Sequence, residues 1–161
     1  MTSPDRITFR EAQEADLPEI VEMLANDPLG KEREDASGAS ADAYLQAFRA
    51  IDVDPHNELL VACDAEEVIG VLQLTFIPNL SYRGSWRCLI EGVRVAEGYR
   101  GQRIGRRLIE QGINRARNRK CRWVQLTTNK SRAAAIAFYE GLGFKATHEG
   151  MKLELQAEET A

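Results

Sequence analysis

The chain has 161 residues, 43% of them hydrophobic and 29% charged, and a formal net charge of −4. These values are typical of a folded globular protein and exclude a disordered one, and no apolar stretch reaches the roughly 20 residues that span a bilayer. Three widely spaced cysteines and two isolated histidines exclude a disulfide framework and argue against a metal site. Because the first residues contain no apolar signal segment, we expect a cytoplasmic protein.

The first third of the chain predicts one strand and two helices. Residues 6–10 alternate in polarity like a short strand. Asp16 and Glu19 fit a capping box, with Pro18 in the first turn, and predict a helix through about Ala25. The polar segment 26–40 reads as a loop, and a second helix follows to about Ile51.

The middle of the chain predicts a run of strands and then a long helix. Apolar and β-branched residues predict strands at 59–63, 68–77 and 86–95. A glycine-containing loop at 98–105 leads into a helix, and one face of that helix is apolar. This face carries Ile104, Leu108, Ile109, Ile113 and Ala116.

The last third predicts a strand at 122–127 and a helix at 133–140 that ends at Gly141–Gly143. Residues 144–148 and 151–155 flank Glu149 and Gly150 and predict a closing hairpin. Strands followed by alternating strands and helices indicate a mixed α/β sheet with helices on both faces.

Positive charge is concentrated in one segment of this acidic chain. Residues 94–122 contain ten Lys or Arg but only two acids, Glu97 and Glu110. Such a segment favours an anionic ligand bound at one place over general affinity for nucleic acid, although a solvated basic helix face has the same composition.

The start of this basic segment predicts an anion site. A strand at 89–95 runs into Tyr99–Arg106 and then into the long helix, so main-chain N–H groups and the positive end of a helix dipole converge there. Arg100, Arg103 and Arg106 add full charges, and a diphosphate is the ligand that fits best. A Walker loop is excluded because Gly105 is followed by arginine.

These residues resemble the GNAT superfamily of N-acetyltransferases. Arg100–Gly105 matches its first motif, Arg/Gln-x-x-Gly-x-Gly/Ala, except that Arg103 replaces the middle glycine. Residues 129–144 resemble its second signature, an Ala-rich helix that ends in Phe-Tyr-Glu-x-Leu-Gly-Phe. The resemblance implies one domain over residues 1–161 with a core of about 6–155. It also implies a mixed, mostly antiparallel sheet of six to seven strands that is splayed at its middle.

The resemblance further implies an enzyme that transfers an acetyl group from acetyl-CoA, without a metal, to the primary amine of a small molecule in a ternary complex. A homodimer is common in the family. Two alternatives are a sensor that binds acyl-CoA without turnover and an enzyme that acetylates proteins or peptides. The residues implied to bind the cofactor are Val93, Arg94, Val95, Arg100, Gly101, Gln102, Arg103, Ile104, Gly105, Arg106, Asn129, Arg132, Ala135, Phe138 and Tyr139.

Two residues are candidates for catalysis. Glu91 shares strand parity with Val93 and Val95, and a carboxylate on an otherwise apolar face suits a general base for the incoming ammonium. If Gly92 forms a bulge, the parity changes, and Glu91 faces solvent or binds the substrate. The resemblance places Tyr139 as the general acid near the coenzyme sulfur, the alternative being a core aromatic. Asn129 is either a pantetheine ligand or a helix cap.

The sequence says least about which residues bind the acceptor amine. The loop at 27–35 and the turn at 81–86 are expected to flank the open side of the fold, and Glu32, Glu34 and Asp35 would attract a cation. Glu34, Trp86 and Glu91 are the predicted substrate residues. Loop charges that only solvate the surface are the alternative.

Overall fold

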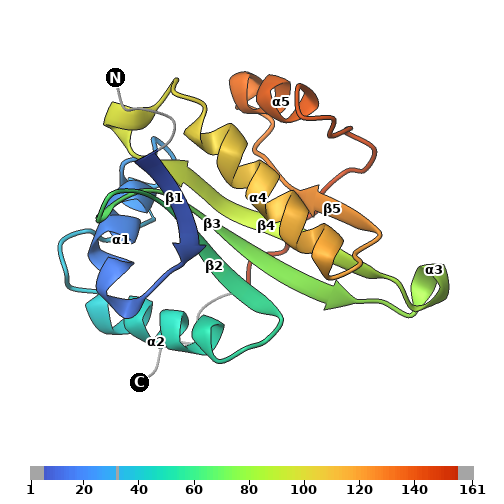
Figure 1. Ribbon diagram of the computed structural model, residues 1–161, viewed down its shortest axis with the longest axis horizontal. Helices are drawn as coiled ribbons and strands as arrows, with labels where there is room; N and C mark the ends of the chain where they lie inside the picture. Colours follow the sequence, from blue (N-terminus) through green and yellow to red (C-terminus); the bar gives the residue numbers. More distant parts are fainter. Residues whose placement is uncertain (1–5, 32, 156–161) are drawn as a thin grey trace. The chain divides into compact units, whose positions relative to one another are not determined.

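A five-stranded sheet forms the centre of the computed structural model, which describes residues 6–31 and 33–155 (Figure 1). By its internal contacts the chain divides into two units, Met1–Leu126 and Thr127–Ala161, and the whole sheet belongs to the first. The strands follow one another in the order of the sequence: β1 (Ile7–Glu11), β2 (Asn57–Asp64), β3 (Glu67–Pro78), β4 (Trp86–Val95) and β5 (Trp123–Leu126).

The sheet is mostly antiparallel, as the sequence predicts. Strands β1 to β4 pair antiparallel with their neighbours, because each is joined to the next by a hairpin or by the two helices that precede β2. β5 pairs parallel with β4, and the connection between them is the long helix α4 (Ile104–Asn118). The expected mixed α/β fold with helices on both faces is therefore confirmed.

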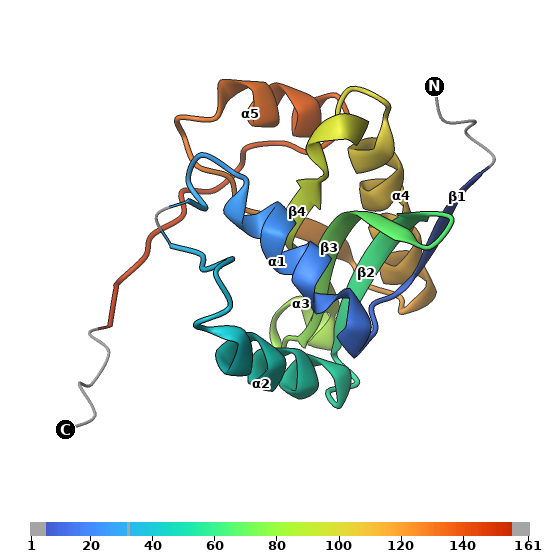
Figure 2. The ribbon, with the colours of Figure 1, turned by 90° about the vertical axis from the view of Figure 1, so that its left-hand side faces the viewer.

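The two faces of the sheet are covered by different helices (Figure 2). On one face, α4 buries Leu108 and Ile109 completely, and a Cβ added at Gly112 would lie 3.2 Å from Leu74. On the other face lie α1 (Leu17–Ala25) and α2 (Ala41–Asp52). Their core cluster comprises Ala12, Ile20, Met23, Phe48, Val61, Cys63, Val68 and Val71.

The remaining elements are short. In the first unit they are η2 (Glu14–Asp16), α3 (Ser81–Gly84) and η3 (Glu97–Tyr99). In the second unit the helix α5 (Ala133–Glu140) ends as expected, with the N–H of Gly141 donating to the carbonyl of Ala137. Among the described residues, no helix is both long and apolar enough to cross a membrane.

The strand count differs from the expected six to seven. Residues 144–148 and 151–155 were predicted to form a closing hairpin, but neither segment is a strand in the described structure. Alternating polarity in Met151–Leu155 fits a strand, but a lone hairpin is only marginally stable without a sheet to join. The prediction of the hairpin was wrong because local pattern alone does not supply a pairing partner.

Asp16 stabilises the N-terminal segment in a different way from the predicted capping box. Its side chain makes no capping bond at the start of α1. One carboxylate oxygen accepts the N–H of Gln13 at 2.7 Å, and Arg10 donates two hydrogen bonds to the carboxylate, at 2.6 and 2.9 Å. These donors, Arg10 first, lower the pKa of Asp16 below its ordinary value. Asp16 therefore joins β1 to α1.

We predict that Asp16→Asn lowers the free energy of unfolding by about 2 kcal/mol at neutral pH, since it leaves the buried Arg10 contacts without a charged acceptor. The matched control is Glu14→Gln, which breaks the exposed pair with Arg49 and costs less than about 1 kcal/mol. Urea denaturation measures both. Because the folded pKa of Asp16 is lowered, its contribution is present above the unfolded value of about 3.8 and is lost as the pH falls through the folded pKa.

The wild type should therefore lose stability on acidification more steeply than Asp16→Asn does. Equal costs for the two substitutions, or parallel acid profiles, would show that the Arg10 contacts contribute no more than a surface ion pair does.

Candidate functional site

A bulge in β4 organises the candidate site. Gln73 of β3 pairs with Glu91, and Val71 pairs with Arg94, so the single residue Leu72 faces two residues of β4, Gly92 and Val93. Gly92 has φ +62°, a backbone conformation that glycine adopts without steric cost. One extra residue on one strand is the definition of a β-bulge, and the bulge that the sequence suggested at Gly92 is present.

The bulge changes which side chains share a face. Gly70 faces α4, because a Cβ there would lie 2.8 Å from Leu108, and its partner Val95 faces α4 with it. Glu91 lies on the opposite face beside Gln73 and is exposed. Simple alternation predicted that Glu91 shares a face with Val93 and Val95. In the structure it does not. The change of parity that the sequence left open at Gly92 is observed, and the role of Glu91 stays a prediction.

Past the bulge, one edge of β4 is open. β5 pairs only with residues 87–90, whereas β4 continues to Val95. The N–H of Ala96 donates to Ile69 of β3 at 2.9 Å, so Ala96 directs its main-chain polar groups towards β3. Because these directions alternate along a strand, Val93 and Val95 direct theirs towards the open edge. This edge is a template on which an amide-containing chain can bind as an extra strand.

Two guanidinium groups brace this edge. Arg94 Nη1 donates to the carbonyl of Val93 at 2.8 Å, and Arg100 Nε donates to the carbonyl of Val95 at 3.3 Å. Arg94 also forms an ion pair with buried Asp27 at 3.5 Å. The structure thus gives the side chain of Arg94 a positioning role at the strand. Each carbonyl has a second lone pair and can accept a further hydrogen bond.

After β4, the chain passes through η3 and the turn at 100–103 and reaches the N-terminus of α4. Gly101 has φ +76°, and Arg103, the N-cap, has φ +64°. The first N–H groups of α4, those of Ile104, Gly105 and Arg106, have no acceptor within the helix, and the helix dipole is positive at this end. When residues beside such a terminus have a left-handed backbone conformation, successive N–H groups point into one concave site, which suits an anion.

The charged residues of this turn surround the N–H groups. Arg100 and Arg103 are exposed, and the side chain of Arg106 is half exposed and paired with Glu110 at 3.0 Å. Gln102 Nε2 donates to the carbonyl of Gly98 at 3.0 Å and so closes the loop. The positive φ of Arg103 explains why the family motif has glycine there, and its exposed side chain shows how the chain tolerates arginine.

Tyr99 attaches the turn to the sheet. Its hydroxyl lies 3.2 Å from an oxygen of Asp64 and 3.1 Å from one of Glu67, and these two residues stand on either side of the β2–β3 turn. Desolvation, together with the neighbouring carboxylates, raises the pKa of Tyr99 to about 12. The hydroxyl therefore keeps its proton and remains a donor at neutral pH. Sequence patterns gave no signal for this contact.

The later arginines of α4 have structural partners in the first unit. Arg107 lies over the ring of Phe9 at 5.0 Å, and Arg119 lies over the ring of Phe76 at 4.1 Å. Arg115 forms an ion pair with Glu58, which is buried. Three arginines of the basic segment therefore contact side chains of the sheet, whereas those around the helix N-terminus face solvent.

The second unit holds the other predicted cofactor residues. Asn129 Oδ1 accepts the N–H and the hydroxyl of Ser131, at 2.9 and 2.8 Å, in a turn that precedes α5. The N-cap is Arg132, so Asn129 is not the cap. The ring of Tyr139 lies 5.1 Å from that of Phe138 and 5.9 Å from that of Phe144, which fixes its plane. Ala135 lies within α5.

The predicted acceptor residues are not gathered at one point. Glu34 accepts a hydrogen bond from Tyr44 at 2.8 Å and pairs with Arg33 at 3.4 Å, while Glu32 lies outside the described residues. Trp86 pairs with Pro78. It lies five positions before Glu91 in β4, and because successive side chains alternate between the faces, Trp86 is on the opposite face from Glu91. Among the described residues, no three His, Cys, Asp or Glu side chains come together as a metal site requires.

Sequence reasoning missed the polar residues beside Glu91. Gln73 and Thr75 alternate with Leu72, Leu74 and Phe76 in β3 and share the exposed face with Glu91. Their signal was polar residues at every second position in a strand that is otherwise apolar, which indicates a face that is not fully covered.

Comparisons with known proteins agree with this geometry. Residues 19–144 match the acetyltransferase (GNAT) family. An aminoalkylphosphonate N-acetyltransferase of Salmonella typhimurium is 30% identical over 106 residues, which are 66% of this chain and 68% of that protein.

Solved structures share the fold over nearly the whole chain. The crystal structure of a transcriptional regulator from Bacillus halodurans C-125 is 51% identical, with a TM-score of 0.90, and the match covers 92% of this chain and 99% of that one. An aminoglycoside N-acetyltransferase in complex with CoA is 17% identical, with a TM-score of 0.76 and coverage of 94% and 95%. The last likeness concerns the fold alone.

We predict that Arg103→Gly unfolds at a higher urea concentration than Arg103→Ala. Both remove the charge, but only glycine removes the cost of the left-handed backbone, about 1–2 kcal/mol. Because glycine also makes the unfolded chain more flexible, the net difference should be on the order of 0.5–1 kcal/mol. A more stable alanine variant would contradict the left-handed conformation at this position.

Proposed function

This chain belongs to the acetyltransferase (GNAT) family, and we propose that it transfers an acetyl group from acetyl-CoA to the primary amine of a small molecule, by direct attack in a ternary complex. One observation carries the proposal: the open edge of β4 at Val93 and Val95 is followed, after the connection at 96–103, by the N–H groups at the start of α4. An extended amide chain that ends in a diphosphate has the chemistry of both parts.

The residues present fit CoA. The edge of Val93 and Val95 would hold the two amides of the pantetheine arm as an added strand. The N–H groups of residues 101–106 would bind the diphosphate, with the guanidinium groups of Arg100, Arg103 and Arg106 around it. In the second unit, we assign Asn129, Arg132, Ala135, Phe138 and Tyr139 to the same ligand.

When bound, acetyl-CoA supplies an acyl group activated as a thioester. Glu91 would accept, through water, a proton from the incoming ammonium, because only the neutral amine has a lone pair with which to attack. A main-chain N–H of the bulged strand near Val93 would stabilise the negative charge that develops on the carbonyl oxygen. Tyr139 would protonate the departing thiolate. As the amide forms, the nitrogen would lose its second proton, and this proton would restore the hydroxyl of Tyr139. The ammonium thus gives up two protons, one to Glu91 and one, by way of Tyr139, to the thiol of CoA.

A small amine is the acceptor class that the comparisons favour. The Salmonella relative is described as an aminoalkylphosphonate N-acetyltransferase, and its match covers about two thirds of each chain. Exposed Glu91 suits the positive charge of any alkylammonium. Glu34 and Trp86 remain candidates for contacts with the rest of the substrate.

A sensor that binds acyl-CoA without turnover is the second candidate. The Bacillus halodurans protein, 51% identical, is described as a transcriptional regulator. The two functions share the CoA site and differ in chemistry, so product formation separates them. Incubation with acetyl-CoA and a panel of aminoalkylphosphonates, amino acids, polyamines and aminoglycosides, followed by mass measurement of the acetylated amine, is the deciding experiment.

We predict that CoA binds measurably in a calorimeter and raises the melting temperature, whereas pantetheine, which lacks the diphosphate, binds at least about tenfold more weakly. The reason is that each charge-assisted hydrogen bond contributes about 1.5–3 kcal/mol. Arg100→Ala removes one of the guanidinium groups that would surround the diphosphate. Arg117→Ala, at the far end of α4, is its matched control. Absence of heat and of thermal shift with CoA and with acyl-CoAs would refute the proposed function.

We predict that Tyr139→Phe lowers kcat by about 10²–10⁴-fold while the calorimetric affinity for CoA stays unchanged, because general acid catalysis contributes in this range. Tyr82→Phe is the control, since Tyr82 lies in α3, away from β4 residues 91–95. An unchanged kcat in Tyr139→Phe would remove the hydroxyl from the mechanism.

We predict that Glu91→Gln reduces kcat/KM at neutral pH and that the defect shrinks as the pH approaches the pKa of the amine, since a neutral amine needs no base. Glu97→Gln, six residues further on, controls for the loss of a charge. A defect of constant size over the whole pH range would assign Glu91 to binding alone.

A further inference from the structure

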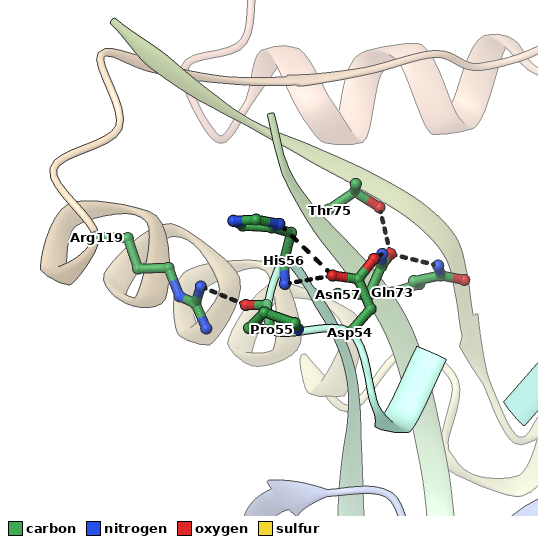
Figure 3. Close-up of polar contacts among 7 residues, drawn as sticks. All are labelled: Asp54, Pro55, His56, Asn57, Gln73, Thr75 and Arg119. Atoms are coloured by element: carbon green, nitrogen blue, oxygen red, sulfur yellow. Dashed lines mark hydrogen bonds and ion pairs between the residues drawn. The ribbon is translucent and has the colours of Figure 1, made fainter. Parts of the chain in front are cut away.

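Three polar side chains on β2 and β3 form a connected group (Figure 3). One of them, Gln73, pairs with Glu91 in the β3–β4 register. Asn57 Oδ1 accepts hydrogen bonds from Gln73 Nε2 at 3.1 Å and from the hydroxyl of Thr75 at 2.9 Å. Asn57 Nδ2 donates to Asp54 Oδ2 at 2.7 Å. None of these residues has a role in the chemistry proposed above, and Gln73 and Thr75 lie on the face that α1 and α2 leave partly open.

The direction of every hydrogen bond in this group is fixed by Asp54. The N–H of His56 and then the side chain of Asn57 hold the pKa of Asp54 below its ordinary value, so the group is a carboxylate at neutral pH. A carboxylate can only accept hydrogen bonds. Asn57 must therefore turn its NH₂ towards Asp54 and its oxygen towards Gln73.

The orientation of the Gln73 amide follows from that of Asn57. Because the oxygen of Asn57 can only accept, Gln73 must present its NH₂ to Asn57. Its Oε1 is then turned away from Asn57, as Figure 3 shows, and it has no hydrogen-bond donor among the described residues. The network thus holds one uncharged oxygen in a defined direction on the open face.

Glu91 is the direct neighbour of Gln73 across the β3–β4 pair. Gln73 and Glu91 are opposite each other in the β3–β4 register, upstream of the bulge, so their side chains share a face with Cβ atoms about 5 Å apart. The carboxylate of Glu91 is exposed and makes no ion pair or side-chain hydrogen bond with residues 6–31 or 33–155. A neutral acceptor and a charged acceptor therefore lie side by side.

Apolar side chains frame this pair. Leu59 of β2 lies directly opposite Gln73 on its other side, and Leu89 of β4 lies opposite Thr75. The hydroxyl proton of Thr75 is already donated to Asn57, so it offers no donor that would compete. The arrangement is an acceptor pair on a partly apolar surface, which is the environment that recognises an alkylammonium group.

We propose that Gln73 binds the acceptor amine: its Oε1 accepts an N–H of the substrate nitrogen while Glu91 faces another. The assignment rests on the proposed function and specifies its acceptor site. An ammonium that gives one proton to Glu91 keeps N–H groups, and a hydrogen bond to Gln73 holds the nitrogen while its lone pair forms. Asn57, with Asp54 behind it, acts as a positioning residue for Gln73. The substrate class is a primary alkylamine.

The test is the steady-state kinetics of Gln73→Met, with the amine and acetyl-CoA varied separately, using the best amine of the panel described above. Methionine keeps the length and removes the oxygen. We expect the KM for the amine to rise about tenfold or more, the range for a hydrogen bond to a charged donor. The KM for acetyl-CoA and the calorimetric affinity for CoA should stay unchanged.

Two further variants separate binding from structure. Gln73→Glu keeps an oxygen for the amine but loses the hydrogen bond to Asn57 that positions it, so binding by Gln73 predicts a KM for the amine between those of the wild type and of Gln73→Met. Thr75→Val removes the other donor to Asn57 and should also leave this KM nearly unchanged. If Gln73→Glu were as defective as Gln73→Met, Gln73 would serve only the network and the proposal would fail.

The outcome also distinguishes this proposal from the proposed function. A wild type that acetylates amines, together with a Gln73→Met variant of unchanged amine KM, would overturn the role of Gln73 and leave the transferase intact. A wild type that binds CoA and acetylates no amine of the panel would overturn both.

Discussion

The bulge at Gly92 is the constraint on which the candidate site depends. Two residues of β4 oppose Leu72, so the alternation of side chains and of main-chain directions is reset at this point. Before it, Glu91 faces the same side as Gln73, and after it, Val93 and Val95 turn their amides to the open edge. In a regular strand, Glu91, Val93 and Val95 would share one face and one edge, and the side chain proposed for the amine would then not be separated from the amides proposed for a carrier.

Much of the first unit was predictable because its signals are local. Alternation over β3 and β4 and the apolar stripe of α4 follow from the periods of strand and helix, and they do not depend on distant contacts. Leu108, Ile109 and Ala116 are buried as that stripe indicates. The turn before α4 and its helix start were predictable for the same reason, since glycine at a strand-to-helix turn and N–H groups at a helix start are properties of adjacent residues. That an anion binds there stays a prediction.

The rest depends on contacts that a linear pattern does not contain. The carboxylate of Asp16 could accept either from the N–H groups at the start of α1 or from Arg10. The hydrogen bonds from the charged guanidinium of Arg10 are stronger, and Asp16 makes those instead of the predicted bond to α1. Arg94 was expected among the cofactor residues, but the sequence pattern gave no sign of its ion pair with Asp27, 67 positions earlier in the chain, which holds its side chain at the strand. Residues 144–155 have the alternation of a hairpin without a described partner strand. That the chain forms one domain stays a prediction.

A difference in chemistry separates the two halves of the site. A long carrier with amides and a diphosphate can be held by main-chain groups, which every residue except proline supplies, so backbone conformation decides where it binds. The signs of such a site are glycines, positive φ angles and a helix start, and all are visible in the sequence around Gly101. An amine is a single small donor and needs side-chain acceptors with a fixed direction. That direction is set at Asp54, passes through Asn57 to Gln73, and depends on two hairpin registers. The proposal for the acceptor side therefore depends on registers that the sequence alone does not give.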